Sequence, residues 1–135
     1  MEITVVKEFT FDAAHKLPSH LGKCKNLHGH TYRLQVGVKG PIDPETGMVV
    51  DFATVKEIVE STIVNALDHG YLNEMDRDED YFNDFPKWNP TAELMVAWMV
   101  RVLTNFFNEQ WEGIVKLALV RLYETPTSYA EWRAC

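Results

Sequence analysis

Two stretches of the chain alternate between apolar and polar side chains, and this alternation constrains the fold more than any other feature. A period of two is the pattern of a β-strand with one buried face, and it occurs in residues 2–11 and again in residues 31–39. The segment between them, KLPSHLGKCKN, contains proline and glycine and is typical of a loop. If the two strands pair as an antiparallel hairpin, the end of the first lies beside the start of the second. The apolar positions are Ile3, Val5, Phe9 and Phe11 in the first strand and Tyr32, Leu34, Val36 and Val38 in the second.

The rest of the chain indicates two helices followed by two more strands. After a turn-rich connection at residues 41–47, helical spacing of Phe52, Val55, Val59 and Ile63 predicts a helix over residues 51–66. A second helix is predicted to have Asn89 as N-cap and Pro90 as its first residue, and to end before Gly113. Residues 114–123 and 128–133 carry strand signals, and the acidic segment 74–84 is interpreted as a solvated loop. This order predicts a single α+β domain over residues 1–135.

The composition narrows the class of protein. The 135 residues carry a net charge of −7, which disfavours attraction to nucleic acid or to an anionic membrane surface. Two cysteines do not make the disulfide framework of a small secreted protein. No signal peptide is expected from the N-terminal residues, and no apolar stretch approaches the roughly 20 residues of a membrane span. We therefore expect a cytoplasmic protein with a reduced thiol.

Three histidines fall at the joined ends of the predicted hairpin. His28 and His30 are two residues apart at the start of the second strand, so their imidazoles project from one face. His15 closes the first strand and would lie beside them in an antiparallel hairpin. Three neutral imidazoles that leave one coordination position open describe a catalytic zinc site. The alternative is a set of exposed strand-end histidines without a metal, since a His-x-His pair is common by chance.

Cys24 precedes the histidine pair in the stretch CKNLHGH. Its neighbours Lys23 and Lys25 favour the thiolate form, so Cys24 is a candidate metal ligand, nucleophile or base. An inert, small core residue is the alternative.

Two further positions carry carboxylates that suit a site. Asp68 precedes His69 in LDHGYLN, where a carboxylate could orient the imidazole of a proton shuttle, or the pair could merely terminate the helix. Glu124 follows an apolar strand in LYETPTS. Its carboxylate could accept two N–H bonds from the amidine-like edge of a guanine or pterin ring, or it could be a solvated turn residue.

Taken together, six fragments spread over nearly the whole chain resemble the family of 6-pyruvoyltetrahydropterin synthase and its bacterial relative, 6-carboxytetrahydropterin synthase. The fragments are FDAAH (11–15), CKNLHGHTY (24–32), DF (51–52), LDHGYLN (67–73), PTAE (90–93) and ETPTSYAEW (124–132). Three residues separate the cysteine from His-Gly-His, a spacing that resembles the carboxy-producing enzyme of the queuosine pathway.

The resemblance implies a zinc-dependent lyase that acts on 7,8-dihydroneopterin triphosphate, with one Zn²⁺ per subunit. His15, His28 and His30 would hold the metal, and Cys24 would be the proton acceptor rather than a fourth ligand.

The remaining roles are also implied by the resemblance. His69, oriented by Asp68, would relay a proton. Glu124 would anchor the pterin ring and take part in the relay, with Thr91 and Glu93 as supporting substrate contacts at the start of the second helix.

The implied architecture is the tunnelling fold (T-fold), with an antiparallel sheet, two helices on one face, and active sites between the subunits of a homohexamer built as a dimer of trimers. Exposed sheet edges would favour such pairing. The expected products are 6-carboxy-5,6,7,8-tetrahydropterin, acetaldehyde and triphosphate. The alternatives are a pyruvoyl-type synthase, a relative that only cleaves the dihydroneopterin side chain, and a non-catalytic zinc- or pterin-binding module. A zinc hydrolase is disfavoured because no glutamate lies close in sequence to the histidine pair.

Overall fold

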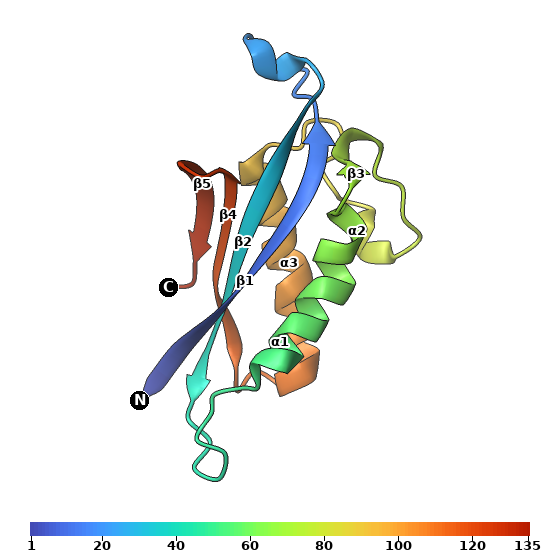
Figure 1. Ribbon diagram of the computed structural model, residues 1–135. Coiled ribbons are helices and arrows are strands. Elements are labelled where there is room, and N and C mark those ends of the chain that lie inside the picture. The colour runs from blue at the N-terminus through green and yellow to red at the C-terminus, as the bar shows by residue number, and fades with distance from the viewer.

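A long antiparallel hairpin forms the centre of the sheet in the computed structural model, which describes residues 1–135 (Figure 1). Its strands are β1 (Glu2–His15) and β2 (His28–Pro41), and β4 (Lys116–Thr125) and β5 (Ser128–Arg133) continue the sheet beyond β2. A two-residue strand, β3 (Gly70–Tyr71), lies on the other edge, so the strand order is β3-β1-β2-β4-β5. The predicted hairpin and the two C-terminal strands are therefore confirmed.

The register of the hairpin joins the ends that carry the histidines. Pairing runs from Glu2 opposite Pro41 to His15 opposite His28, and Ala13 lies opposite His30. Residues directly opposite one another in an antiparallel pair project from the same face. The alternation that predicted the strands thus also places His15 and the histidine pair side by side.

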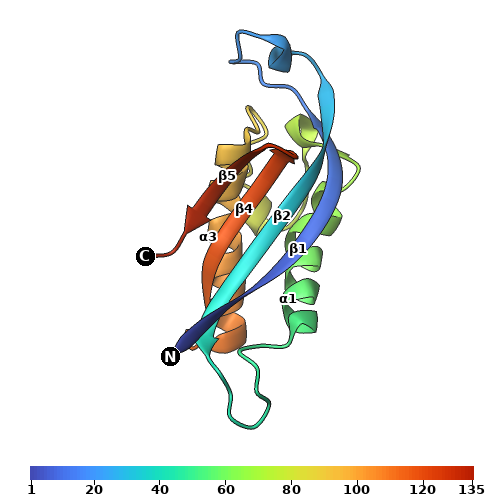
Figure 2. The ribbon, with the colours of Figure 1, turned by 60° about the vertical axis from the view of Figure 1, so that its left-hand side comes forward.

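Two helical segments cover one face of the sheet (Figures 1 and 2). The first is continuous through α1 (Phe52–Val59), a π-helical turn (Glu60–Val64) and α2 (Asn65–Leu67), and Asp51 caps it by accepting a bond from the Ala53 amide. The second, α3 (Ala92–Trp111), passes beside it. The buried residues of these helices and of the sheet form one continuous core. Full burial of one aliphatic side chain in such a core contributes about 1.5–3 kcal/mol to the free energy of folding. Phe52, predicted to lie on the buried face, is 48% exposed, whereas Val55, Val59 and Ile63 are buried as predicted.

The start of α3 corrects one prediction. The N-cap is Thr91, whose hydroxyl accepts a bond from the Leu94 amide, and the helix begins at Ala92 instead of Pro90. Thr91 is in the extended region (φ −71°, ψ 158°), and the Pro90 carbonyl is used by His15. The chain therefore stays extended for two residues longer than the Asn-Pro signal indicated.

The four long strands pair in antiparallel fashion as expected, and the two-residue β3 adds one parallel pairing that the sequence did not predict. β3 pairs with β1 in parallel, with Gly70 opposite Ala13. The His69 amide donates to the Asp12 carbonyl at 2.6 Å, which brings the chain onto the free edge of β1 as it leaves α2. His69 takes a left-handed conformation (φ 60°), which is uncommon and strained for a residue with a Cβ.

The acidic segment 74–84 is more than a solvated loop. It contains the short helical turn Asp80–Phe82, and Phe82 is buried with its ring centroid 4.9 Å from that of Trp98. The Trp98 indole donates to the Tyr81 carbonyl at 2.8 Å. The acidic side chains stay outside while the aromatic residues between them pack against α3, so the interpretation was correct only for the charged positions. Two other short turns are Lys23–Lys25 and Leu72–Glu74. No helix has the length and apolar character needed to cross a lipid bilayer.

The packing of segment 74–84 gives a stability prediction. Phe82→Ala should lower the free energy of unfolding by about 3 kcal/mol, because it removes a buried ring and leaves a cavity beside Trp98. Asp78→Asn, at an exposed position in the same segment, should change it by less than about 0.5 kcal/mol. Urea unfolding of both variants measures this. Equal, small effects would mean that the segment is not packed in solution.

Candidate metal and active site

Four side chains from three strands converge at one end of the sheet. His15 ends β1, His28 and His30 begin β2, and Glu124 lies near the end of β4. One donor atom from each residue, an imidazole nitrogen or a carboxylate oxygen, lies within 4.8 Å of every other. His15 is fully buried, and the other three are half-buried. The structure thus brings together the three predicted metal ligands and adds Glu124 to them.

The tautomers of two histidines are fixed by backbone carbonyls. His15 Nδ1 lies 2.9 Å from the Pro90 carbonyl, and His28 Nδ1 lies 2.7 Å from the Asn26 carbonyl. A carbonyl oxygen only accepts, so both Nδ1 atoms carry the proton and, in neutral rings, both Nε2 atoms present lone pairs. Those Nε2 atoms face each other at 3.0 Å. Two lone pairs at this separation call for a cation between them, and a carbonyl bond on the far nitrogen is the usual support of a metal-bound imidazole.

The electrostatics of the cluster favour neutral imidazoles. Burial lowers the pKa of His15 below its ordinary value of 6.5, against the raising effect of the Pro90 carbonyl and of Glu124. Burial likewise lowers the pKa of His30, again against Glu124. His30 Nε2 is buried and has no hydrogen-bond partner. Metal ligands must be unprotonated, so the donors fit a divalent ion with imidazole affinity, such as zinc.

Tyr32 contacts His15 of the cluster and was not among the predicted site residues. Its side chain is fully buried and stacks on Phe11 with ring centroids 5.0 Å apart. Its hydroxyl lies 3.4 Å from His15 Nδ1, and burial raises its pKa well above the ordinary value. Tyr32 therefore lies in the cluster as a neutral phenol. The signal was its place two residues after His30, which puts both side chains on one strand face.

Asp68 and His69 form a second group on the other side of β1. Asp68 Oδ2 lies 3.0 Å from His69 Nδ1, as expected for an oriented imidazole. The Asp12 amide donates to Asp68 Oδ1 at 3.0 Å, and this bond, followed by the bond from His69, lowers the pKa of Asp68. Asp12 was not among the predicted site residues, and its carboxylate accepts a 2.5 Å bond from the Thr31 hydroxyl. The imidazole of His69 is 80% exposed, so one face of this group is free.

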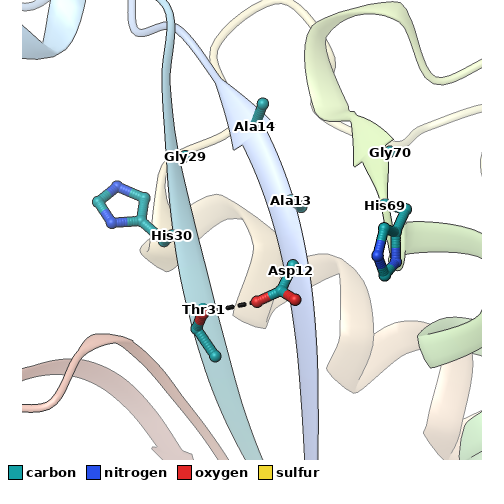
Figure 3. Close-up of a pocket in the computed structure, with 8 residues that line it drawn as sticks. All are labelled: Asp12, Ala13, Ala14, Gly29, His30, Thr31, His69 and Gly70. Atoms are coloured by element: carbon teal, nitrogen blue, oxygen red, sulfur yellow. Dashed lines mark hydrogen bonds between the residues drawn. The ribbon is translucent and has the colours of Figure 1, made fainter.

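Two hollows meet at His30. The first, about 410 Å³, is lined by His30, Thr31, Asp12 and His69, and Figure 3 shows His30 and His69 flanking it on either side of the β1–β2 pair. The second, about 570 Å³, lies between β2 and β4.

The second hollow is lined by His30, Glu124, Arg33 and Tyr123, with the Arg33 guanidinium stacked 3.9 Å above the Tyr123 ring. Volumes of this order suit a small ligand. The combination of a stacked cation, an aromatic ring and a carboxylate suits a flat, polar heterocycle with an anionic substituent.

Other predicted site residues lie outside these contacts. Cys24 is half-buried in the turn Lys23–Lys25, which stands beyond the ends of β1 and β2 in Figure 1, and it belongs to neither group. Its carbonyl accepts a bond from the Leu17 amide, which closes the loop. Thr91 is the N-cap of α3, and Glu93 is exposed in its first turn. Within one chain, the structure therefore does not bring Cys24, Thr91 or Glu93 to the metal cluster.

The fold and the cluster define an α+β protein with a three-histidine cluster at a strand end that could hold a metal ion. The family described as 6-pyruvoyl tetrahydropterin synthase matches residues 4–135. Two relatives are named 6-carboxy-5,6,7,8-tetrahydropterin synthase. The one from Haemophilus influenzae is 35% identical over 96% of this chain and 97% of its own length, and the one from Synechocystis is 38% identical over 95% and 91%. The 6-pyruvoyl tetrahydrobiopterin synthase of Drosophila melanogaster is 32% identical over 92% of this chain and 75% of its own.

Among solved structures, the 6-pyruvoyl tetrahydropterin synthase of Caenorhabditis elegans superposes with a TM-score of 0.79 at 27% identity, covering 100% of this chain and 97% of the other. The chain belongs to the 6-pyruvoyl tetrahydropterin synthase family. The expectation of a T-fold-like α+β architecture is confirmed.

The lowered pKa values of His15 and His30 predict how the metal-free protein responds to pH. Both imidazoles bind protons less readily in the folded than in the unfolded chain, so stability is full above 6.5 and is lost as pH falls through the lower, folded values. Urea unfolding of metal-free protein at a series of pH values from above 6.5 downward should show that the free energy of unfolding decreases.

Two variants make the test specific. His30→Gln should flatten the pH response, whereas His20→Gln, at an exposed loop position, should keep it. An unchanged response in His30→Gln would show that His30 is not a source of the pH dependence.

Proposed function

We propose that this chain is a zinc-dependent 6-carboxy-5,6,7,8-tetrahydropterin synthase, which converts 7,8-dihydroneopterin triphosphate to 6-carboxy-5,6,7,8-tetrahydropterin, acetaldehyde and triphosphate in queuosine biosynthesis. The observation that carries the proposal is the cluster of His15, His28 and His30, in which backbone carbonyls leave the Nε2 atoms of His15 and His28 unprotonated. Relatives that match over nearly their whole length bear this enzyme's name.

The three histidines would hold the zinc, oriented by the Pro90 and Asn26 carbonyls. When bound, zinc would act as a Lewis acid that polarises the hydroxyls of the substrate side chain and makes the adjacent C–H protons acidic. His15 is fully buried, so water has no access to its ring nitrogens. The chain itself must then supply groups that take and return protons.

Cys24 is proposed as the proton acceptor and His69, oriented by Asp68, as the relay. The Asn26 carbonyl that binds His28 follows the Cys24 turn directly, so the cysteine loop and the metal cluster share one backbone connection. This connection supports a thiol that faces the metal-bound side of the substrate. Glu124, Thr91 and Glu93 are proposed as substrate contacts.

A homohexamer with active sites between subunits is part of the proposal. Two observations support it. The Asp68–His69 pair is exposed and Cys24 is not grouped with it, so a site that needs both would be completed by a second chain. The sheet also ends in two open edges, at β5 and at the two-residue β3, and open edges favour pairing with a second chain.

A 6-pyruvoyl-type synthase is the second candidate, favoured by the name of the Drosophila melanogaster relative. It would use the same substrate and the same residues but would leave a different side chain on the pterin.

The product distinguishes the two. Zinc-loaded protein incubated with 7,8-dihydroneopterin triphosphate should give 6-carboxytetrahydropterin and acetaldehyde, as measured by mass spectrometry. A product with a pyruvoyl side chain would support the second candidate. Binding of the pterin without conversion by fully zinc-loaded protein would contradict both and indicate a binding module.

The role of the thiol has its own test. Cys24→Ala should keep one zinc per chain and lose turnover by about 10²–10⁴-fold, the range of a lost general base. Cys135→Ala, at the exposed terminal thiol, should retain both. Metal analysis and product assay of the two variants decide the matter, and loss of zinc in Cys24→Ala would make Cys24 a ligand instead.

A further inference from the structure

We propose that Glu124 is the fourth protein ligand of the metal in the resting protein, so that the centre is closed until a substrate displaces the carboxylate. Displacement of the carboxylate by a substrate rests on the proposed function. The closed resting centre does not, because it requires only a bound metal ion.

The spacing of the donor atoms supports four ligands around one ion. Donors held at about 2.0–2.1 Å from a tetrahedral zinc lie about 3.3 Å from one another. Glu124 Oε1 lies 3.2 Å from His30 Nε2, and the Nε2 atoms of His15 and His28 lie 3.0 Å apart. Every other donor pair among the four residues lies within 4.8 Å. The carboxylate oxygen therefore lies close enough to the three imidazoles to serve as the fourth donor to one ion.

The alignment of Glu124 and His30 points the same way. At 3.2 Å a carboxylate and an imidazole are close enough for a hydrogen bond, yet His30 Nε2 has no hydrogen-bond partner and is buried. A ring nitrogen that donated to Glu124 would point its N–H at the oxygen. Neighbouring ligands of one ion behave differently, because both direct their lone pairs at the ion rather than at each other. The contact has the distance of adjacent ligands and lacks the direction of a hydrogen bond.

The surroundings of Glu124 allow it to leave the cluster. Its side chain is 23% exposed and lines the hollow of about 570 Å³ between β2 and β4. Of the four donors, Glu124 and His30 line this hollow: Glu124 lies near the end of β4, and His30 lies at the start of β2. A ligand bound in the hollow would therefore contact the Glu124 carboxylate. No cysteine belongs to the cluster, so Glu124 has no competitor for the fourth position within the chain.

The visible spectrum of the Co²⁺-substituted, full-length protein tests the closed centre. An open position on a three-histidine centre holds a water, and on zinc this water ionises near pH 7. On Co²⁺ the ionisation of the bound water changes the visible spectrum with pH. The wild-type spectrum should stay constant between about pH 6.5 and 9 because Glu124 excludes that water. Glu124→Ala should acquire the pH-dependent change and bind the metal at least about tenfold more weakly in chelator competition. Glu109→Ala, at an exposed position on α3, should match the wild type.

The wild-type spectrum decides the matter even if Glu124→Ala folds poorly. A wild-type spectrum that titrates near pH 7 overturns the proposal. Complete loss of Co²⁺ from a folded Glu124→Ala, with far-ultraviolet circular dichroism unchanged, supports it. The product assay on wild-type zinc protein tests the proposed function separately. An enzyme whose metal centre is open can still form the carboxy product. A closed centre without turnover would contradict the proposed function but not the fourth ligand.

Discussion

The structure depends on the pairing of β1 with β2, because the register of this hairpin decides where the histidines lie. His15 is opposite His28 and Ala13 is opposite His30, so the imidazole of His15 meets those of His28 and His30, 13 and 15 residues further along the chain, at one strand end. A slip by one residue would turn the side chains of β1 to the other face of the sheet and remove His15 from the cluster. Burial prevents such a slip. Phe9 and Phe11 share the face of His15 and lie in the core, where Leu34 and Tyr32 are their partners across the hairpin.

The same strand carries the second group on its opposite face. Asp12 follows Phe11 and therefore points away from the core, and its backbone binds both Asp68 and the His69 amide. β1 thus positions the candidate metal ligand His15 with one residue and the exposed Asp68–His69 pair with another. The left-handed conformation of His69 is the local consequence, since the chain must turn sharply after α2 to reach the edge of β1. Strain of this kind persists where surrounding bonds fix it, and it is common at functional sites.

The sequence was sufficient for what depends on local periodicity. Alternation in β1 and β2 predicted the hairpin, and the hairpin brought His15 to His28 and His30. The features that it missed depend on contacts between distant segments. Helix α3 begins at Ala92 because the Pro90 carbonyl is bound by His15, 75 residues away, and no local signal reports this. Likewise, the packing of Phe82 on Trp98 was hidden by the acidic residues around it. The short β3 pairs with β1 just after the His69 amide binds the Asp12 carbonyl, a contact between segments far apart in the chain.

The metal cluster also links site and stability. His15 is a fully buried polar residue, and an unpaired buried polar group costs about 1–3 kcal/mol. One ring nitrogen is satisfied by the Pro90 carbonyl, while the other faces the lone pair of His28. A divalent ion would satisfy both Nε2 atoms and the unpartnered Nε2 of His30 together. Binding of a metal would therefore be coupled to folding of this strand end, because the ion would stabilise only the folded arrangement of the donors. The Pro90 carbonyl connects the cluster to the start of α3, which carries Thr91 and Glu93, and the Asn26 carbonyl connects it to the loop of Cys24. The same coupling would therefore reach the segments that carry these three predicted site residues.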